Sequence, residues 1–158
     1  MNFYSPTKGK LSFNAAFDDI MDYIESQPEE SYKLIIGTDS HAFLNDNVTF
    51  VTAIIVHRQG KGGRYYFQKH KQQYLESLRH RIYFEASLSL EVASRLAEKL
   101  SHSGHSEMNI EIHLDIGEKG ETRDIIKEIV GMVIGSGYDA RIKPESYGAS
   151  KVADKYTR

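Results

Sequence analysis

Cysteine is absent from this chain of 158 residues. Its absence excludes a disulfide framework, a thiolate-bound metal and a cysteine nucleophile, and it is typical of the reducing cytoplasm, where we expect the protein. No apolar run is long enough to span a bilayer. Segment 1–10 also lacks the apolar core of a secretory signal. We therefore expect neither membrane insertion nor export.

An overall excess of positive charge is also missing, since the formal net charge is −2. This argues against a protein that holds nucleic acid through bulk charge alone. Segment 56–81 is the exception, with seven basic residues and a single acid, Glu76. It is either a solvated hairpin and helix start or a surface that faces phosphates. The candidate nucleic-acid contacts are Arg58, Lys61, Arg64, Lys69 and Lys71.

Length and hydrophobic periodicity predict one α/β domain over residues 1–158. Apolar residues at helical spacing predict four helices, over 12–26 with Ser12 as N-cap, 78–100, 122–134 with Thr122 as cap, and 148–156. Alternating or continuous apolar runs predict five strands, over 33–38, 48–57, 64–72, 109–115 and 138–143.

The connections between these elements predict the topology of a mixed sheet. Short turns join the first three strands, which should form an antiparallel meander, and a glycine-rich hairpin lies at 59–63. The later strands alternate with helices, so they need right-handed crossovers and a parallel part of the sheet. In the third strand Tyr65, Tyr66 and Phe67 could stack on bases, but cross-strand packing is the favoured interpretation.

Two acidic residues occupy positions where a charged carboxylate would lose contact with water, which is costly. Asp39 ends the apolar strand 33–38, so it either forms a turn or belongs to a metal or catalytic site. Glu85 lies inside the apolar arc of helix 78–100, where a carboxylate must be paired, protonated or bound to a metal. The alternative for Glu85 is a buried salt bridge to Arg79 or Arg81.

A third acid, Asp115, ends the strand 109–115. Sites in α/β sheets form beyond the carboxyl ends of parallel strands. If the first and fourth strands are parallel neighbours, Asp39 and Asp115 lie side by side there. Two such carboxylates need a cation between them, and a divalent metal is the usual one. Asp154 has only the local pattern of a surface acid.

Five short motifs carry a resemblance to a known family. They are GTDSH at 37–41, HLDIG at 113–117, GMVIG at 131–135, KPES at 143–146 and ASKVAD at 149–154. Together with the order of elements they are similar to the YkuK-like branch of the ribonuclease H-like superfamily. The resemblance covers nearly all of the chain after Lys10.

The resemblance implies a five-stranded sheet in the order 3-2-1-4-5, with strand 2 antiparallel, flanking helices and an extra N-terminal helix. It also implies a two-metal site in which Asp39 bridges both ions, Glu85 and Asp115 hold one, and Asp154 holds the other. Carboxylate oxygens suit Mg²⁺ or Mn²⁺. The implied chemistry is phosphodiester hydrolysis in RNA, RNA–DNA hybrid or structured DNA.

The chain departs from the family pattern in one respect, because loop 144–148 has no histidine. His41 and His113 lie near the predicted centre instead, with Ser40 and Lys143 as further supporting residues. A buried, hydrogen-bonded role is the simpler interpretation of His113.

Two other functions remain open. The net acidity and the missing loop histidine favour a catalytically inactive binding or scaffold protein with the same fold. A phosphotransfer domain ranks last, because the glycines at 60–63 lack Walker spacing. Nucleic acid is the expected partner, and the sequence is compatible with a homo-oligomer.

Overall fold

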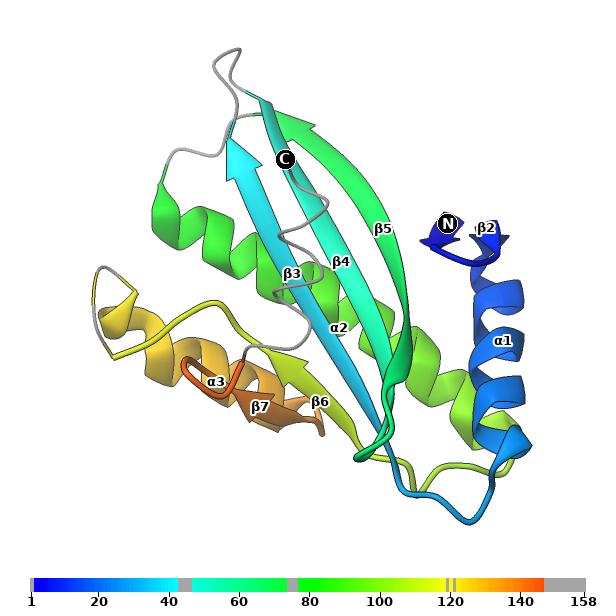
Figure 1. Ribbon diagram of the computed structural model, residues 1–158. Helices are drawn as coiled ribbons and strands as arrows, with labels where there is room; N and C mark the ends of the chain where they lie inside the picture. The colour runs from blue at the N-terminus through cyan, green and yellow to red at the C-terminus, as the bar shows by residue number, and fades with distance from the viewer. Residues whose placement is uncertain (1, 43–46, 74–76, 119, 121, 147–158) are drawn as a thin grey trace.

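The computed structural model describes residues 2–42, 47–73, 77–118, 120 and 122–146 (Figure 1). Its strands are β1 (Asn2–Ser5), β2 (Gly9–Ser12), β3 (Tyr32–Ala42), β4 (Asn47–Arg58), β5 (Gly63–Gln73), β6 (Ile110–His113) and β7 (Asp139–Arg141). Its helices are α1 (Phe13–Ser26), α2 (Leu78–His102), the short 3-10 helix η1 (Arg123–Ile125) and α3 (Ile126–Gly135).

The central strands follow the predicted topology. The sheet has the order β2-β1-β5-β4-β3-β6-β7, and its last five positions reproduce the expected order 3-2-1-4-5. β4 is antiparallel to both β3 and β5, whereas β6 is parallel to β3 and β7 is parallel to β6. The α/β class and the mixed sheet are therefore confirmed.

The N-terminal hairpin of β1 and β2 was not predicted. It extends the five-stranded sheet to seven strands and joins β5 at one residue pair, Tyr4 with Phe67. Phe3 is fully buried in the core, while Tyr4 on the opposite face is 40 % exposed. A strand of four residues is too short to show a reliable period in the sequence, which explains the omission.

Some predicted details of the later elements were wrong. β6 ends at His113, two residues before the predicted end of that strand. Thr122 makes no side-chain cap; its hydroxyl accepts a hydrogen bond from the Gly117 N–H at 3.2 Å, and a 3-10 turn precedes α3. The helix predicted over 148–156 lies outside the described residues.

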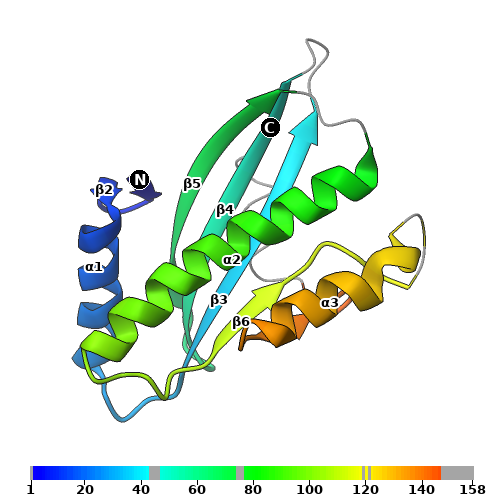
Figure 2. The ribbon, with the colours of Figure 1, turned by 180° about the vertical axis from the view of Figure 1, so that it is seen from behind.

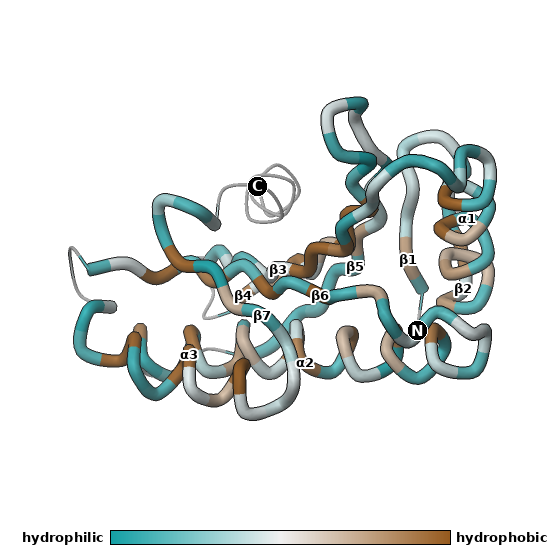
Figure 3. The backbone as a smooth tube through the Cα atoms, turned by 90° about the horizontal axis from the view of Figure 1, so that it is seen from below, coloured by the Kyte–Doolittle hydropathy of each residue, from teal (hydrophilic) through white to brown (hydrophobic). Residues whose placement is uncertain are grey.

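The helices α2 and α3 cover one face of the sheet, as Figures 2 and 3 show. Between them and the sheet lies the main core, to which β3 gives Leu34 and Ile36 and α2 gives Val92 and Leu96. The predicted N-cap Ser12 is confirmed, since its hydroxyl accepts from the Ala15 N–H at 3.0 Å. Within the part of the chain that the structure describes, none of the helices has the length and apolar character needed to cross a membrane.

Candidate functional site

β3 presents its residues alternately to the two faces of the sheet. The Thr38 hydroxyl lies 2.8 Å from the Ser89 hydroxyl of α2, so Thr38 faces the helices. The Ser40 hydroxyl donates to the Glu85 carboxylate, also on α2. Because side chains alternate along a strand, Asp39 faces the opposite side, which we call the far face of the sheet.

The pairing between β3 and β6 ends close to Asp39 and Asp115. β3 and β6 pair from Leu34 with Ile110 to Gly37 with His113. Beyond that pair, the segment that follows β6 moves away from β3 and towards β7 (Figure 1). There the Leu114 N–H donates to the Arg141 carbonyl at 2.8 Å. Asp39 and Asp115 each follow the last pair by two residues. Both therefore stand at the carboxyl rim of these parallel strands, where α/β sheets form sites.

Glu85 reaches this rim from the helix side. Only 7 % of it is exposed, and its neighbours Ile82, Ala86 and Ser89 on α2 are buried as well. The pKa of Glu85 is raised from 4.5 to about 8, mainly by burial and in addition by the charges of Asp39 and Asp115. The hydrogen bond from Ser40 and the charge of Arg81 act in the opposite direction. The structure thus brings Glu85 within electrostatic reach of both aspartates.

The salt bridge considered for Glu85 is not found among the described residues. Arg79 pairs with Glu128 instead, at 2.7 Å. Arg81 donates through Nη2 to the hydroxyl and the carbonyl of Ser40, at 3.0 and 3.3 Å. Its Nε–H is buried and has no hydrogen-bond partner among the described residues. Arg81 therefore acts on Glu85 both through its charge and through its hydrogen bond to Ser40, a connection that the sequence pattern did not suggest.

Asp115 is 2.9 Å from the ammonium group of Lys143. Lys143 was predicted as a supporting residue, and here it supplies the positive charge at this carboxylate. Among the described residues, no three histidine, aspartate or glutamate side chains stand close enough together to hold a metal ion. Asp154, the fourth predicted ligand, lies outside the described residues.

The carboxylates of Asp39, Glu85 and Asp115 are of the kind that binds a divalent ion. Carboxylate oxygens are the ligands that Mg²⁺ and Mn²⁺ prefer. A cation would also offset the repulsion that raises the pKa of Glu85. Chemistry and charge therefore fit an ion, while the side chains of Asp39, Glu85 and Asp115 do not by themselves form a complete ligand sphere.

His113 belongs to a second buried polar group. Its Nε2 lies 2.8 Å from Glu111 Oε1, and the other oxygen of Glu111 faces Lys33 at 3.3 Å and Arg141 at 3.6 Å. Burial lowers the pKa of His113 although the hydrogen bond to Glu111 opposes the change. The hydrogen-bonded role expected of His113 is confirmed. The charged Glu111 on a buried strand was the signal that could have revealed this group.

The remaining predicted histidine, His41, is exposed near the end of β3, two residues beyond Asp39 and on the same face. The four residues near this rim therefore lie on two different faces of the sheet. Ser40 and Glu85 meet on the helix side, while Asp39 and His41 belong to the far face.

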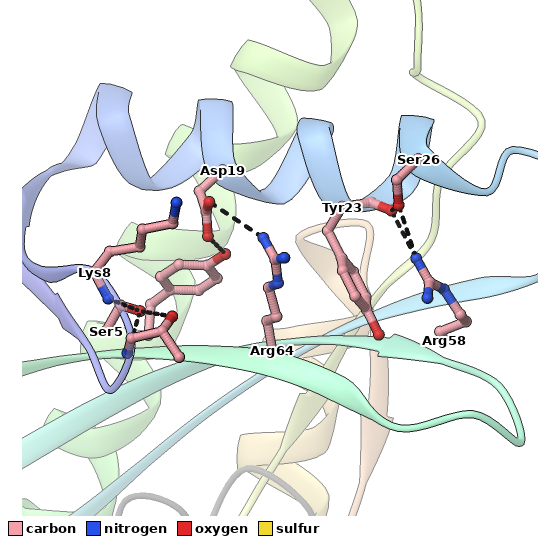
Figure 4. A network of polar contacts seen from close by, with 9 residues as sticks. Ser5, Lys8, Asp19, Tyr23, Ser26, Arg58 and Arg64 are labelled. Atoms are coloured by element: carbon pink, nitrogen blue, oxygen red, sulfur yellow. Dashed lines mark hydrogen bonds and ion pairs between the residues drawn. The ribbon is translucent and has the colours of Figure 1, made fainter.

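Two of the predicted nucleic-acid contacts hold α1 against the sheet (Figure 4), and a third is paired just beyond the end of that helix. The Arg58 guanidinium lies 4.1 Å from the ring centre of Tyr23 and donates to the Tyr23 carbonyl. Arg64 forms an ion pair with Asp19 at 3.2 Å. Lys61 pairs with Glu30, just after the helix. These contacts give the three cations a structural role.

The other two, Lys69 and Lys71, share a face with Asp39. Asp39 pairs with Val51, and Val51 with Lys69. His41 and Lys71 are related in the same way through Thr49. Directly opposed residues of antiparallel strands point to the same face. With strands about 4.8 Å apart, the Lys69 backbone lies roughly 10 Å from that of Asp39.

Comparisons with known proteins agree with this architecture. The family model described as ribonuclease H-like matches residues 15–158. The uncharacterized protein YkuK of Bacillus subtilis (strain 168) is 33% identical over 167 aligned residues, covering 99% of this chain and 96% of that protein. No solved structure matches the chain. Sheet order, family model and relative together place the chain in the YkuK-like branch of the ribonuclease H-like family.

Proposed function

We propose that this protein is a divalent-metal-dependent nuclease that hydrolyses phosphodiester bonds in RNA, RNA–DNA hybrid or structured DNA. The observation that carries the proposal is the environment of Glu85. Glu85 is buried between α2 and the sheet, and the charges of Asp39 within β3 and of Asp115 just beyond β6 raise its pKa. Crowded acids are stabilised either by a proton on one of them or by a bound cation, and a cation that displaces the proton would make this an ion-binding site.

Asp39, Glu85 and Asp115 would hold Mg²⁺ or Mn²⁺, with Asp154 as a further ligand. A bound divalent ion activates water and stabilises the leaving oxygen of a phosphodiester. The chain's own groups prepare the site. Ser40 orients the Glu85 carboxylate through its hydroxyl, and Lys143 neutralises Asp115. The ammonium group of Lys143 is also positioned to leave Asp115 and bind a phosphate oxygen.

A catalytically inactive protein that binds nucleic acid is the second candidate. Two observations favour it. The described residues contain no group of three ligands close enough for an ion, and Asp115 already has a cation in Lys143. In this case the acidic residues would be balanced by protein groups, and the protein would bind no divalent ion at them.

Titration with Mn²⁺ by calorimetry separates the two candidates. We expect wild-type protein to bind Mn²⁺ at pH 7 and to release close to one proton. The pKa of Glu85 is about 8, so its carboxyl group is mostly protonated before the ion binds. The heat should therefore change with the ionisation enthalpy of the buffer. Asp39→Asn should weaken binding at least about tenfold, a loss of roughly 1.4 kcal/mol.

Asp139→Asn is the matched control, because Asp139 is an exposed aspartate on β7. It should bind Mn²⁺ as the wild type does. Absence of binding at millimolar Mn²⁺, or equal binding by Asp39→Asn, would leave the inactive binding protein as the better account.

A further inference from the structure

An exposed aromatic pair lies on the far face beside the two lysines. Tyr4 of β1 and Phe67 of β5 are directly opposed and stacked, with ring centres 5.7 Å apart and planes inclined by 28°. Phe67 packs on Val51 and Ala53, which fix its ring. Tyr4 remains 40 % exposed at the outer end of this stack. It therefore offers a supported ring to a further planar group.

The charges next to this pair differ from those around α1. Lys69 and Lys71 are exposed on β5, and neither takes part in an ion pair among the described residues. They follow Phe67 at positions two and four further along the strand, so all three side chains share the far face. Alternate residues of a strand lie about 7 Å apart. A ring and two cations are thus evenly spaced along one line.

We propose that Tyr4, Phe67, Lys69 and Lys71 form a track that binds single-stranded nucleic acid and leads to the carboxylates. This inference rests on the nuclease proposal and names its substrate class. Phosphates contact the two lysines, and an unpaired base stacks on Tyr4. Lys69 is about 10 Å from Asp39 in the same row of the sheet, so a strand held there can place a neighbouring phosphate at the rim.

The aromatic ring decides between a single strand and a duplex. Bases within a duplex are stacked on one another, and their faces are not available to a side chain. A ring on a sheet surface can stack on an unpaired base of any sequence, which typically contributes about 1–3 kcal/mol. Two lysines alone would fit either form, whereas two lysines with a supported ring fit the single strand.

Fluorescence anisotropy with labelled oligonucleotides in EDTA tests the track without cleavage. The wild type should bind a single strand more tightly than a duplex of the same sequence. Lys69→Gln/Lys71→Gln should weaken single-strand binding about tenfold or more and reduce the salt slope by roughly 1.4, since each phosphate contact contributes about 0.7. Tyr4→Ser should weaken binding at least about fivefold at every salt concentration.

The controls lie on η1 and α3, on the opposite side of the sheet. Arg123→Gln/Lys127→Gln removes two exposed cations there, and Ile134→Ser removes an apolar side chain that is 59 % exposed. Both variants should bind as the wild type does. Equal affinity of the wild type for the duplex, or unchanged single-strand binding by the Lys69/Lys71 variant or by Tyr4→Ser, would overturn the track.

The same assay keeps this inference distinct from the nuclease proposal. In EDTA no divalent ion is bound, so single-strand binding measured there reports on the track alone. Track-dependent binding by a wild-type protein that cleaves nothing with Mn²⁺ would support the track and reject the nuclease. Metal-dependent cleavage that persists unchanged in Tyr4→Ser and in the lysine variant would reject the track and leave the nuclease.

Discussion

Replacing Asp39 with asparagine should abolish metal-dependent cleavage of nucleic acid, with a rate at least about 10³-fold below that of the wild type. Asp39 stands at the rim where β3 and β6 separate, and its charge acts on the buried Glu85. Asparagine keeps the shape and removes the charge. A loss of about 4 kcal/mol of metal-dependent stabilisation corresponds to the expected factor.

The fold of the Asp39 variant should remain intact, because the change removes repulsion from Glu85. Circular dichroism and thermal unfolding check this. Asp139→Asn, with an exposed aspartate on β7, should cleave at the wild-type rate. Full activity of purified Asp39→Asn would remove Asp39 from the mechanism and, with it, the proposed arrangement of ligands.

Replacing Glu85 with glutamine should make the metal-free protein more stable at high pH. In the folded protein the pKa of Glu85 is about 8, above the ordinary 4.5. The folded state therefore binds more protons between these values, and wild-type stability falls as pH rises from about 4.5 to 8. Glutamine carries no proton to lose. At pH 9 the variant should be more stable by roughly 3–5 kcal/mol.

Urea unfolding at pH 5 and pH 9, with EDTA present, measures this difference. Near pH 5 Glu85 is mostly protonated in the folded protein, so the variant should differ little from the wild type. The control is Glu91→Gln, an exposed glutamate on the same helix, which should follow the wild type at both values. If the free energy of unfolding changes equally with pH in the wild type and in Glu85→Gln, the pKa of Glu85 is not raised. The proposed cluster of acidic residues around Glu85 would then be wrong.

Much of the fold could be predicted because the central elements are long and periodic. β3, β4 and β5 each have eleven or twelve residues, and their connections leave few topologies. The phase of α2 predicted that Glu85 faces the sheet, since 25 residues at 100° each define an apolar arc well. The confirmed burial of Glu85 follows from that phase.

The missed features depend on contacts between distant segments. Arg58 and Arg64 looked like free surface cations, yet partners on α1 engage both. Sequence periodicity does not reveal which charges a helix will cover. The pairing of Arg81 with Ser40 likewise joins residues that are 41 positions apart. The far-face row of Asp39 and Lys69 required the strand register, which only the structure provides.

A crystal soaked in Mn²⁺ at about pH 8, with anomalous diffraction, tests the carboxylate site most directly. We expect an anomalous peak bound by Asp39, Glu85 and Asp115, with the Asp115 carboxylate withdrawn from Lys143. A map without manganese at this rim, in which Glu85 keeps its contact with Ser40 and Asp115 its contact with Lys143, would contradict it.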